Sequence, residues 1–293
     1  MVLSVLYMAI TLFKKYHSLK RRRAPFTDNF LRSPGESLRF KIQELNDDVT
    51  VALLSMLVMP LVLYSAFITQ IHFGKSSNPV FTVVVGLSIF GYSLVKTVLL
   101  LNTGRHYRLG YDGEIAVAQE LNRLMLDGYH VYHDVPGKGF NIDHVVVGPA
   151  GVFAVETKAR LKTTTFNHAS DARVRYDGRK LQFPNWTETK SLEQAQLQGK
   201  WLSNWLSSAV GQPVGVRPVV AIPGWFVERT ASGGSPVINP KEFKFLLKSS
   251  GGAALDAVMI NRIVHQLEQR CRNVHSITAE ILNGPDHPQA TLP

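Results

Sequence analysis

Cysteine is nearly absent from this sequence of 293 residues, in which Cys271 is the only one. A single cysteine excludes an internal disulfide and any cysteine-rich zinc site, and it fits a reducing compartment. Acidic residues are also few, with 22 Asp and Glu against 32 Lys and Arg, which gives a formal net charge of +10. Such a surplus favours a polyanionic partner, either nucleic acid or acidic lipid headgroups. The glycines form neither a P-loop nor a dinucleotide-binding fingerprint.

Formal charge is missing altogether from residues 49–73. At about 1.5 Å per residue, this apolar stretch is long enough to cross the roughly 30 Å core of a bilayer. Residues 80–101 form a second such stretch, whose one charged side chain, Lys96, can reach the interface near its end. The alternative is a buried helical hairpin in a soluble core. Two long apolar runs this close together instead favour a transmembrane hairpin over 49–101.

The orientation follows from basic side chains. The connection between the two apolar stretches holds only Lys75, and Arg105 and Arg108 follow the second stretch. Many more precede the first stretch, namely Lys14, Lys15, Lys20, Arg21, Arg22, Arg23, Arg32, Arg39 and Lys41. The positive-inside rule then places both termini in the cytosol, as expected of a multi-pass protein of the cell inner membrane.

The segment 1–48 is therefore expected to be basic and cytosolic or interfacial, in contact with membrane lipids. Its first apolar residues, 2–13, lack the basic region and the cleavage site of a signal peptide. They are expected to form either an interfacial helix or a third, short span.

After Leu101 the pattern changes to short strands and helices, which predicts a mixed α/β domain over 105–272 and a loose tail over 273–293. Asp112 is expected to cap a helix that runs to about Asp127. The remaining expected elements are strands at 130–135, 140–147, 152–158 and 217–222, a hairpin at 173–183 with a two-residue turn, and helices from Ser191 and over 254–270.

The chemistry is concentrated in the hairpin of the strands 140–147 and 152–158. If residues 148–151 close it, Asp143 lies directly opposite Glu156, and Asn141 lies opposite Lys158 on the same face. Like charges opposed in a sheet are destabilising, so a divalent cation is the simplest reason for the carboxylate pair. Mg²⁺ takes oxygen ligands and often uses only one or two carboxylates.

This hairpin resembles a known signature. Asp143, followed by a turn and Glu156-x-Lys158, resembles the PD-(D/E)xK motif of restriction-type endonucleases, with Ile142 where that motif often has proline. Over about residues 108–225 the chain resembles the nuclease-related domain (NERD) family. The blocks that carry this resemblance are Gly110-Tyr111-Asp112-Gly113-Glu114, Asn141-Ile142-Asp143-His144, Gly148-Pro149-x-Gly151-Val152-Phe153, Glu156-Thr157-Lys158 and Gln194.

The resemblance implies a restriction-endonuclease-like fold, a mixed sheet flanked by helices, and a metal-dependent nuclease site. Asp143, Glu156 and Glu114 would bind Mg²⁺ or Mn²⁺, with Glu114 completing the acidic site, and Lys158 would stabilise phosphate or activate water. Gln194 matches a glutamine of the family's site. Two of these residues have simpler readings, since Glu114 suits the first turn of a helix and Gln194 completes a capping box with Ser191.

Weaker signals lie outside this core. Arg173, Arg175 and Lys180 would share one face of the 173–183 hairpin, which either binds phosphates or is simply solvated. Trp186, Trp201 and Trp205 could stack bases, although the last two lie on an apolar helical stripe and fit a core better. His144 would project from the face opposite Asp143, as a core or edge residue. Asn141 at a strand start is commonly structural.

The sequence thus predicts a membrane-anchored nuclease that hydrolyses nucleic acid, with DNA favoured over RNA, at the cytosolic face. A different class remains open, a tethered module that keeps the nuclease fold and binds nucleic acid or protein without turnover. A membrane sensor of lipid or stress is a third interpretation, which uses only the hairpin and the basic segment.

Overall fold

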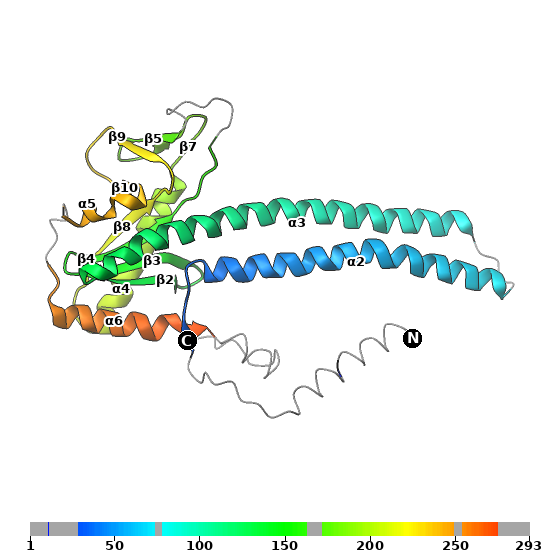
Figure 1. Cartoon of the computed structure of the whole chain (residues 1–293), viewed down its shortest axis with the longest axis horizontal. Coiled ribbons are helices and arrows are strands. Elements are labelled where there is room, and N and C mark those ends of the chain that lie inside the picture. Colours follow the sequence, from blue (N-terminus) through cyan, green and yellow to red (C-terminus); the bar gives the residue numbers. More distant parts are fainter. Residues whose placement is uncertain (1–10, 12–28, 74–77, 163–171, 249–253, 275–293) are drawn as a thin grey trace.

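The computed structural model describes residues 11, 29–73, 78–162, 172–248 and 254–274, and it places two long helices beside an α/β domain (Figure 1). In chain order, the elements are β1 (Phe30–Leu31), α2 (Glu36–His72), α3 (Pro79–Asn122), β2 (His130–Pro136), β3 (Asn141–Gly148), β4 (Gly151–Thr157), β5 (Arg173–Tyr176), β6 (Leu181–Gln182), β7 (Thr187–Glu188), α4 (Lys190–Val210), β8 (Val216–Ala221), β9 (Phe226–Arg229), β10 (Val237–Ile238), α5 (Phe243–Lys248), α6 (Ala257–Cys271) and β11 (Arg272–Val274). The segments 2–13 and 275–293 lie outside the described residues, apart from Thr11.

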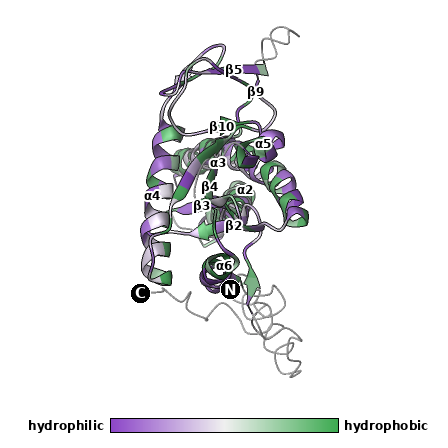
Figure 2. Cartoon of the chain, turned by 90° about the vertical axis from the view of Figure 1, so that its left-hand side faces the viewer, coloured by the Kyte–Doolittle hydropathy of each residue, from purple (hydrophilic) through white to green (hydrophobic). Residues whose placement is uncertain are grey.

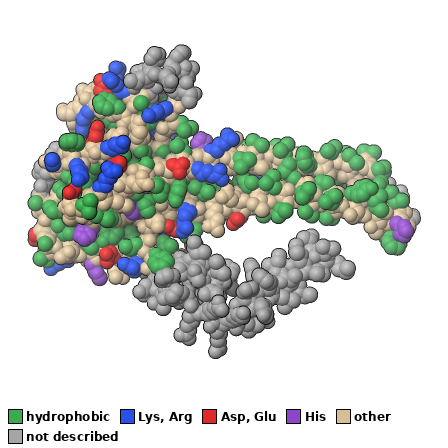
Figure 3. Space-filling model, in the orientation of Figure 1, with side chains coloured by type: hydrophobic (Ala, Val, Ile, Leu, Met, Phe, Trp, Pro, Cys, Tyr) green, Lys and Arg blue, Asp and Glu red, His purple; other side chains and the backbone are tan. Residues whose placement is uncertain are grey.

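The helices α2 and α3 pack along each other and are long and apolar enough to cross a membrane. Their apolar side chains face outward, as at Leu57, 67% exposed, and Val80, 68% exposed. Figure 3 shows this apolar coat along the whole pair, with basic side chains gathered where the pair meets the domain. Between the helices, the Ser55 and Ser93 hydroxyls form a hydrogen bond of 2.8 Å. The exposed coat is unlike the buried helical hairpin of a soluble core.

The predicted helix start at Asp112 is wrong. One unbroken helix, α3, runs for 44 residues from the apolar stretch into the domain, and a short 3₁₀ helix follows at Arg123–Asp127. Asn78 caps the start of α3 instead, because its side chain accepts from the backbone N–H groups of Val80 and Phe81. The last turns of α3 contribute Val117 and Leu121 to the domain core.

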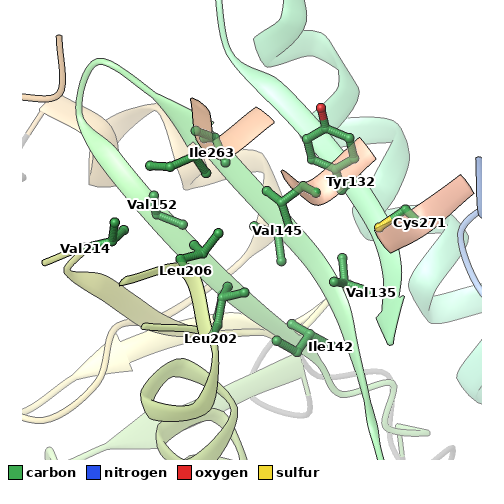
Figure 4. Packing of buried hydrophobic residues seen from close by; sticks show 13 residues of the cluster. Tyr132, Val135, Ile142, Val145, Val152, Leu202, Leu206, Val214, Ile263 and Cys271 are labelled. Atoms are coloured by element: carbon green, nitrogen blue, oxygen red, sulfur yellow. The ribbon is translucent and has the colours of Figure 1, made fainter. Parts of the chain in front are cut away.

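The main sheet has five strands in the order β10-β8-β4-β3-β2. Its centre is mixed, because β4 runs parallel to β8 and antiparallel to β3. The helices α4 and α6 pack on one face, where Leu202, Leu206 and Ile263 meet Val145 and Val152 (Figure 4). The helices α3 and α5 cover the other face, so that helices flank the sheet on both sides (Figure 2). This arrangement confirms the predicted fold class.

A second sheet, in the order β7-β6-β5-β9, stands at one end of the main sheet. Its inner face buries the apolar side chains of Val174, Tyr176, Leu181 and Phe183, as the alternation predicts. The predicted two-residue turn is wrong, because Tyr176 pairs with Leu181 and leaves four residues between them. Within this turn, the Asp177 carboxylate accepts hydrogen bonds from the N–H groups of Arg179 and Lys180, each 2.9 Å long.

Both ends of the described chain join this domain. The strand β1 pairs with β11, so residues 30–31 lie beside residues 272–274. The Arg32 guanidinium then reaches Asp134, which accepts from Nε at 2.9 Å and from Nη2 at 2.6 Å. The residues just before the first long helix are therefore fixed to the α/β domain.

Candidate active site

The register of the β3–β4 hairpin is the predicted one. His144 pairs with Val155 and Val147 with Val152, so the same count sets Asp143 opposite Glu156. The backbone N–H of Thr157 donates to Oδ2 of Asp143 at 2.6 Å, which holds this carboxylate against the neighbouring strand. The alternation of the pleat thus delivers both acids to one face, beside α4.

Five predicted residues come together around one pocket of about 620 Å³ at the end of the main sheet. They are Glu114 from α3, Asp143 and Glu156 from the hairpin, Lys158 just beyond β4 and Gln194 from α4. The Lys158 ammonium lies 2.5 Å from Oε1 of Glu156 and donates to Oε1 of Gln194 at 3.1 Å. Residues up to 80 positions apart in the sequence therefore surround the Lys158 ammonium. This arrangement is suited to binding phosphate.

Burial raises the pKa values of all three acids, and neighbouring carboxylates raise those of Glu114 and Asp143 further. Burial raises the pKa of Glu114 from 4.5 to about 7, and the charges of Asp134 and Glu156 add to the effect. Burial, with the charges of Glu156 and Glu114, holds the pKa of Asp143 well above its usual value. Burial also raises the pKa of Glu156, against the opposing effect of the Lys158 ammonium. Acids packed this tightly are costly in an empty protein and are typical of a site that binds a cation.

The donor set fits a hard cation held by few protein ligands. Glu156 is 1% exposed, and its Oε2 is buried without a hydrogen-bond partner. Over the described parts of the chain, no group of three or more His, Cys, Asp or Glu is close enough together to hold a metal ion. An ion here would therefore use Asp143 and Glu156, with its other positions left to water or phosphate, as Mg²⁺ does elsewhere.

Glu114 is held at the pocket from two directions. Its carboxylate accepts a hydrogen bond from the backbone N–H of Gly35, in the segment before α2. Its neighbour Gly113 touches Ala159, since a Cβ on Gly113 would lie 2.6 Å from that of Ala159. The reading of Glu114 as a first-turn carboxylate does not apply, because α3 begins 35 residues earlier at Pro79.

Gln194 does not belong to a capping box. The helix α4 begins at Lys190, with Thr189 at the N-cap position and no side-chain cap. The Gln194 side chain instead accepts from Lys158, as described above. The Ser191 hydroxyl is buried and lacks a hydrogen-bond partner.

Other candidates lie elsewhere. Arg173 and Arg175 stand on the exposed face of the second sheet, where both lie near Glu228, at 3.6 and 3.3 Å. Lys180 lies in the four-residue turn, and none of the three lines the pocket. Trp201 and Trp205 pack against the main core, and the guanidinium of Arg270 lies over both rings. The Asn141 side chain donates to Asp134 rather than meeting Lys158.

Behind the hairpin lies a chain of buried hydrogen bonds that the sequence does not predict. Burial lowers the pKa values of His133, to about 4, and of His144, so both rings are neutral. The His133 Nε2–H therefore donates to Asn122 Oδ1 at 3.0 Å, and His133 Nδ1 accepts from His144 Nδ1–H at 2.9 Å. The free His144 Nε2 accepts from the Thr157 hydroxyl at 3.1 Å. This chain fixes Thr157, which stands between Glu156 and Lys158, and it agrees with the expected core position of His144.

The fold and the site define a mixed α/β domain with a buried acid–acid–lysine centre, preceded by two helices that could span a membrane. Residues 109–223 match the family model of the nuclease-related domain (NERD). This part of the chain is thus similar to a nuclease-related domain, and the match covers all five residues around the pocket. No curated protein and no solved structure matches the chain.

Proposed function

We propose that this protein is a membrane-anchored nuclease that uses Mg²⁺ or Mn²⁺ to hydrolyse phosphodiester bonds, in DNA rather than RNA, at the cytosolic face of the membrane. The observation that carries the proposal is the convergence of the acids Glu114, Asp143 and Glu156 on one pocket, with the buried Glu156 carboxylate held on Lys158. The match to the nuclease-related domain supports the reaction class.

Each residue of the pocket has a task in this proposal. A bound divalent ion would supply positive charge to the phosphate and lower the pKa of a water nucleophile. Asp143 and Glu156 hold that ion, and Glu114 completes the acidic wall. Lys158 directs its ammonium at the phosphate charge that develops during attack, and Gln194 holds the Lys158 side chain in place.

The anchoring part of the proposal rests on charge and hydropathy. The helices α2 and α3 would cross the bilayer with both termini in the cytosol, and the basic segment before α2 would meet acidic lipid headgroups. The catalytic domain would then stand directly above the cytosolic leaflet, so it would act on DNA that comes to the membrane.

The test compares full-length protein in detergent micelles with its Glu156→Ala variant, on single-stranded, linear and circular DNA. Both are incubated with Mg²⁺, Mn²⁺ or EDTA. We expect cleavage only with metal, and a loss of at least about 100-fold in the variant. The control, Glu242→Ala, removes an exposed acid outside the pocket and should leave the rate unchanged.

The rival is a tethered module that keeps the nuclease fold without turnover. Absence of cleavage by folded protein, together with absence of Mg²⁺ or Mn²⁺ binding in calorimetry, would favour this rival. Metal-dependent cleavage that disappears in Glu156→Ala would exclude it.

A further inference from the structure

Apart from its acids, the pocket is lined by two further groups of side chains that differ in their chemistry. Leu38 of α2 and His106 and Leu109 of α3 form the wall nearest the two long helices. Trp186 belongs to another part of the lining, in the second sheet's region between β6 and β7. Neither wall is needed to hold a metal ion, so their chemistry bears on the rest of the substrate.

Trp186 is fixed as a flat platform. Its indole stacks on Phe183 with ring centroids 4.5 Å apart and planes 10° apart, and Trp225 meets it edge-on at 6.4 Å. Trp225 is itself held, because its Nε1–H donates to the Arg160 carbonyl at 3.1 Å. Phe183 and Trp225 are almost fully buried, whereas Trp186 is half-buried and lines the pocket. The accessible part of the indole is thus presented to the ligand.

The Glu156 carboxylate can be reached only through the pocket. Because Glu156 is 1% exposed, the reacting phosphate has to enter the pocket of about 620 Å³. A pocket of this volume has room for a group the size of a nucleotide beside the reacting phosphate. An aromatic side chain stacks on a base only when that base has left its own stack.

We infer that the site takes a nucleic-acid strand without its complement, with a base stacked on Trp186 while the adjoining phosphate lies at Lys158 and the carboxylates. This inference rests on the proposed function and adds the substrate class to it. A duplex would have to open or present a free end before its phosphate could enter. Stacking is tolerant of sequence, so preference for a strand form is expected without preference for a particular base.

The experiment measures binding and cleavage separately. Binding uses Glu156→Ala protein, full length in micelles, with a fluorescent single-stranded oligonucleotide and the same sequence as a blunt duplex. We expect the single strand to bind tighter, and Trp186→Ala, added to Glu156→Ala, to weaken its binding about 10- to 100-fold with little effect on the duplex. Trp186→Phe keeps a stacking ring and should recover most of the loss. Phe245→Ala, at an exposed ring outside the pocket, is the matched control.

Cleavage uses the wild-type protein on the single strand, the duplex and a duplex with an unpaired central bubble. We expect cleavage of the single strand and of the bubble, and a higher KM with a similar kcat in Trp186→Ala. Equal rates on duplex and single strand, lost in Glu156→Ala, would overturn the substrate class and leave the nuclease standing. If no substrate is cleaved, the proposed activity fails, and the binding comparison still decides the inference. Equal binding of both forms, or binding unchanged by Trp186→Ala, overturns it.

Discussion

At the scale of single residues, the candidate site contains buried acids that suit its proposed chemistry and destabilise the folded protein. Glu114 is 8% exposed, and its neighbours Asp134 and Glu156 both add to the cost of ionising it. The Gly35 N–H and the Lys158 ammonium offset only part of that cost. An acid kept in such surroundings is expected to destabilise the metal-free protein whenever it is ionised.

Glu114→Gln should therefore stabilise the metal-free protein at high pH. The folded pKa of about 7 lies above the ordinary 4.5, so the folded state binds the proton more tightly than the unfolded state does. Stability from this group is fully present below pH 4.5 and is lost as the pH rises to 7. The difference between these two pKa values corresponds to about 3–4 kcal/mol. We expect the variant to exceed wild type by this amount at pH 8 in EDTA, and to match it near pH 4.

The measurement is chemical unfolding of full-length protein in detergent across that pH range. Comparing the two proteins at each pH cancels the contributions of titrating groups that Glu114 does not influence, such as His133 and His144. Glu120→Gln makes the same change on the same helix, at a side chain 20% exposed beside Arg123, and serves as the control. A difference between Glu114→Gln and wild type that does not grow with pH would contradict the prediction.

At the scale of elements, a small polar cluster holds the segment before α2 against the main sheet. Asp134 has a left-handed backbone conformation, with φ 48°, and stands at the point where β2 passes Asp143. Its carboxylate accepts from Arg32, from the N–H and hydroxyl of Ser37, and from Asn141. The strained backbone and the number of partners mark this residue as the junction of the two parts.

Arg32→Ala should destabilise the domain strongly. The Arg32 and Asp134 side chains are 13% and 5% exposed, so the change leaves a buried carboxylate without its counter-ion. Breaking such a pair typically costs about 3–5 kcal/mol. The double change Arg32→Ala with Asp134→Asn removes the charge as well and should recover part of the loss. Unfolding of the wild type, of Arg32→Ala, of Asp134→Asn and of the double variant gives the coupling between the two residues.

Lys244→Ala is the matched control, because its ion pair with Asp127 lies at the surface, with side chains 55% and 47% exposed. Such a pair is worth about 1 kcal/mol or less. If Arg32→Ala costs no more than Lys244→Ala, or if the double change recovers nothing, the ion pair does not hold the segment before α2 against the domain.

How far the sequence predicted these elements depends on the range of the contacts. The β3–β4 hairpin was predictable to the residue, because a four-residue turn and strict alternation fix the register locally. The same short-range pairing predicts that Asp143 and Glu156 lie opposite each other. The pairing of β1 with β11 joins residues about 240 positions apart through strands of two and three residues. Strands this short show no periodicity in the sequence. The sequence therefore does not predict that Arg32, Gly35 and Asp134 lie near the site.

The error at Asp112 has a different cause. Asp before an apolar stripe indicates a helix start only when the chain arrives in a non-helical conformation. Here α3 is already formed, and extending a helix is far easier than nucleating a new one. Gly104, Gly110 and Gly113 lie inside it, and each costs about 1 kcal/mol relative to alanine. At Gly113 the reason is the contact with Ala159, which a methyl group would block.

At the scale of the whole molecule, α3 links the apolar pair directly to the site. Glu114 follows Leu101 by 13 residues in the same helix. At about 1.5 Å per residue the acid stands roughly 20 Å beyond the end of the apolar stretch. Because no loop intervenes, the distance and rotation of the pocket relative to the apolar helix pair are set by one continuous helix. The proposed orientation of the two spans therefore also decides on which side of the membrane the pocket lies.

That orientation can be tested with engineered cysteines, because we expect the buried native thiol not to react with a maleimide. Cys271 is 1% exposed, and burial raises its pKa to about 12. In intact spheroplasts, we expect a membrane-impermeant maleimide to label Ser77→Cys, in the connection between the spans, and not Lys241→Cys, on the exposed surface of the domain. Permeabilisation should make Lys241→Cys reactive and leave the wild type unlabelled. Labelling of Lys241→Cys in intact cells would place the pocket outside and exclude cytosolic DNA as its substrate. Labelling of neither site before permeabilisation would mean that α2 and α3 do not cross the bilayer.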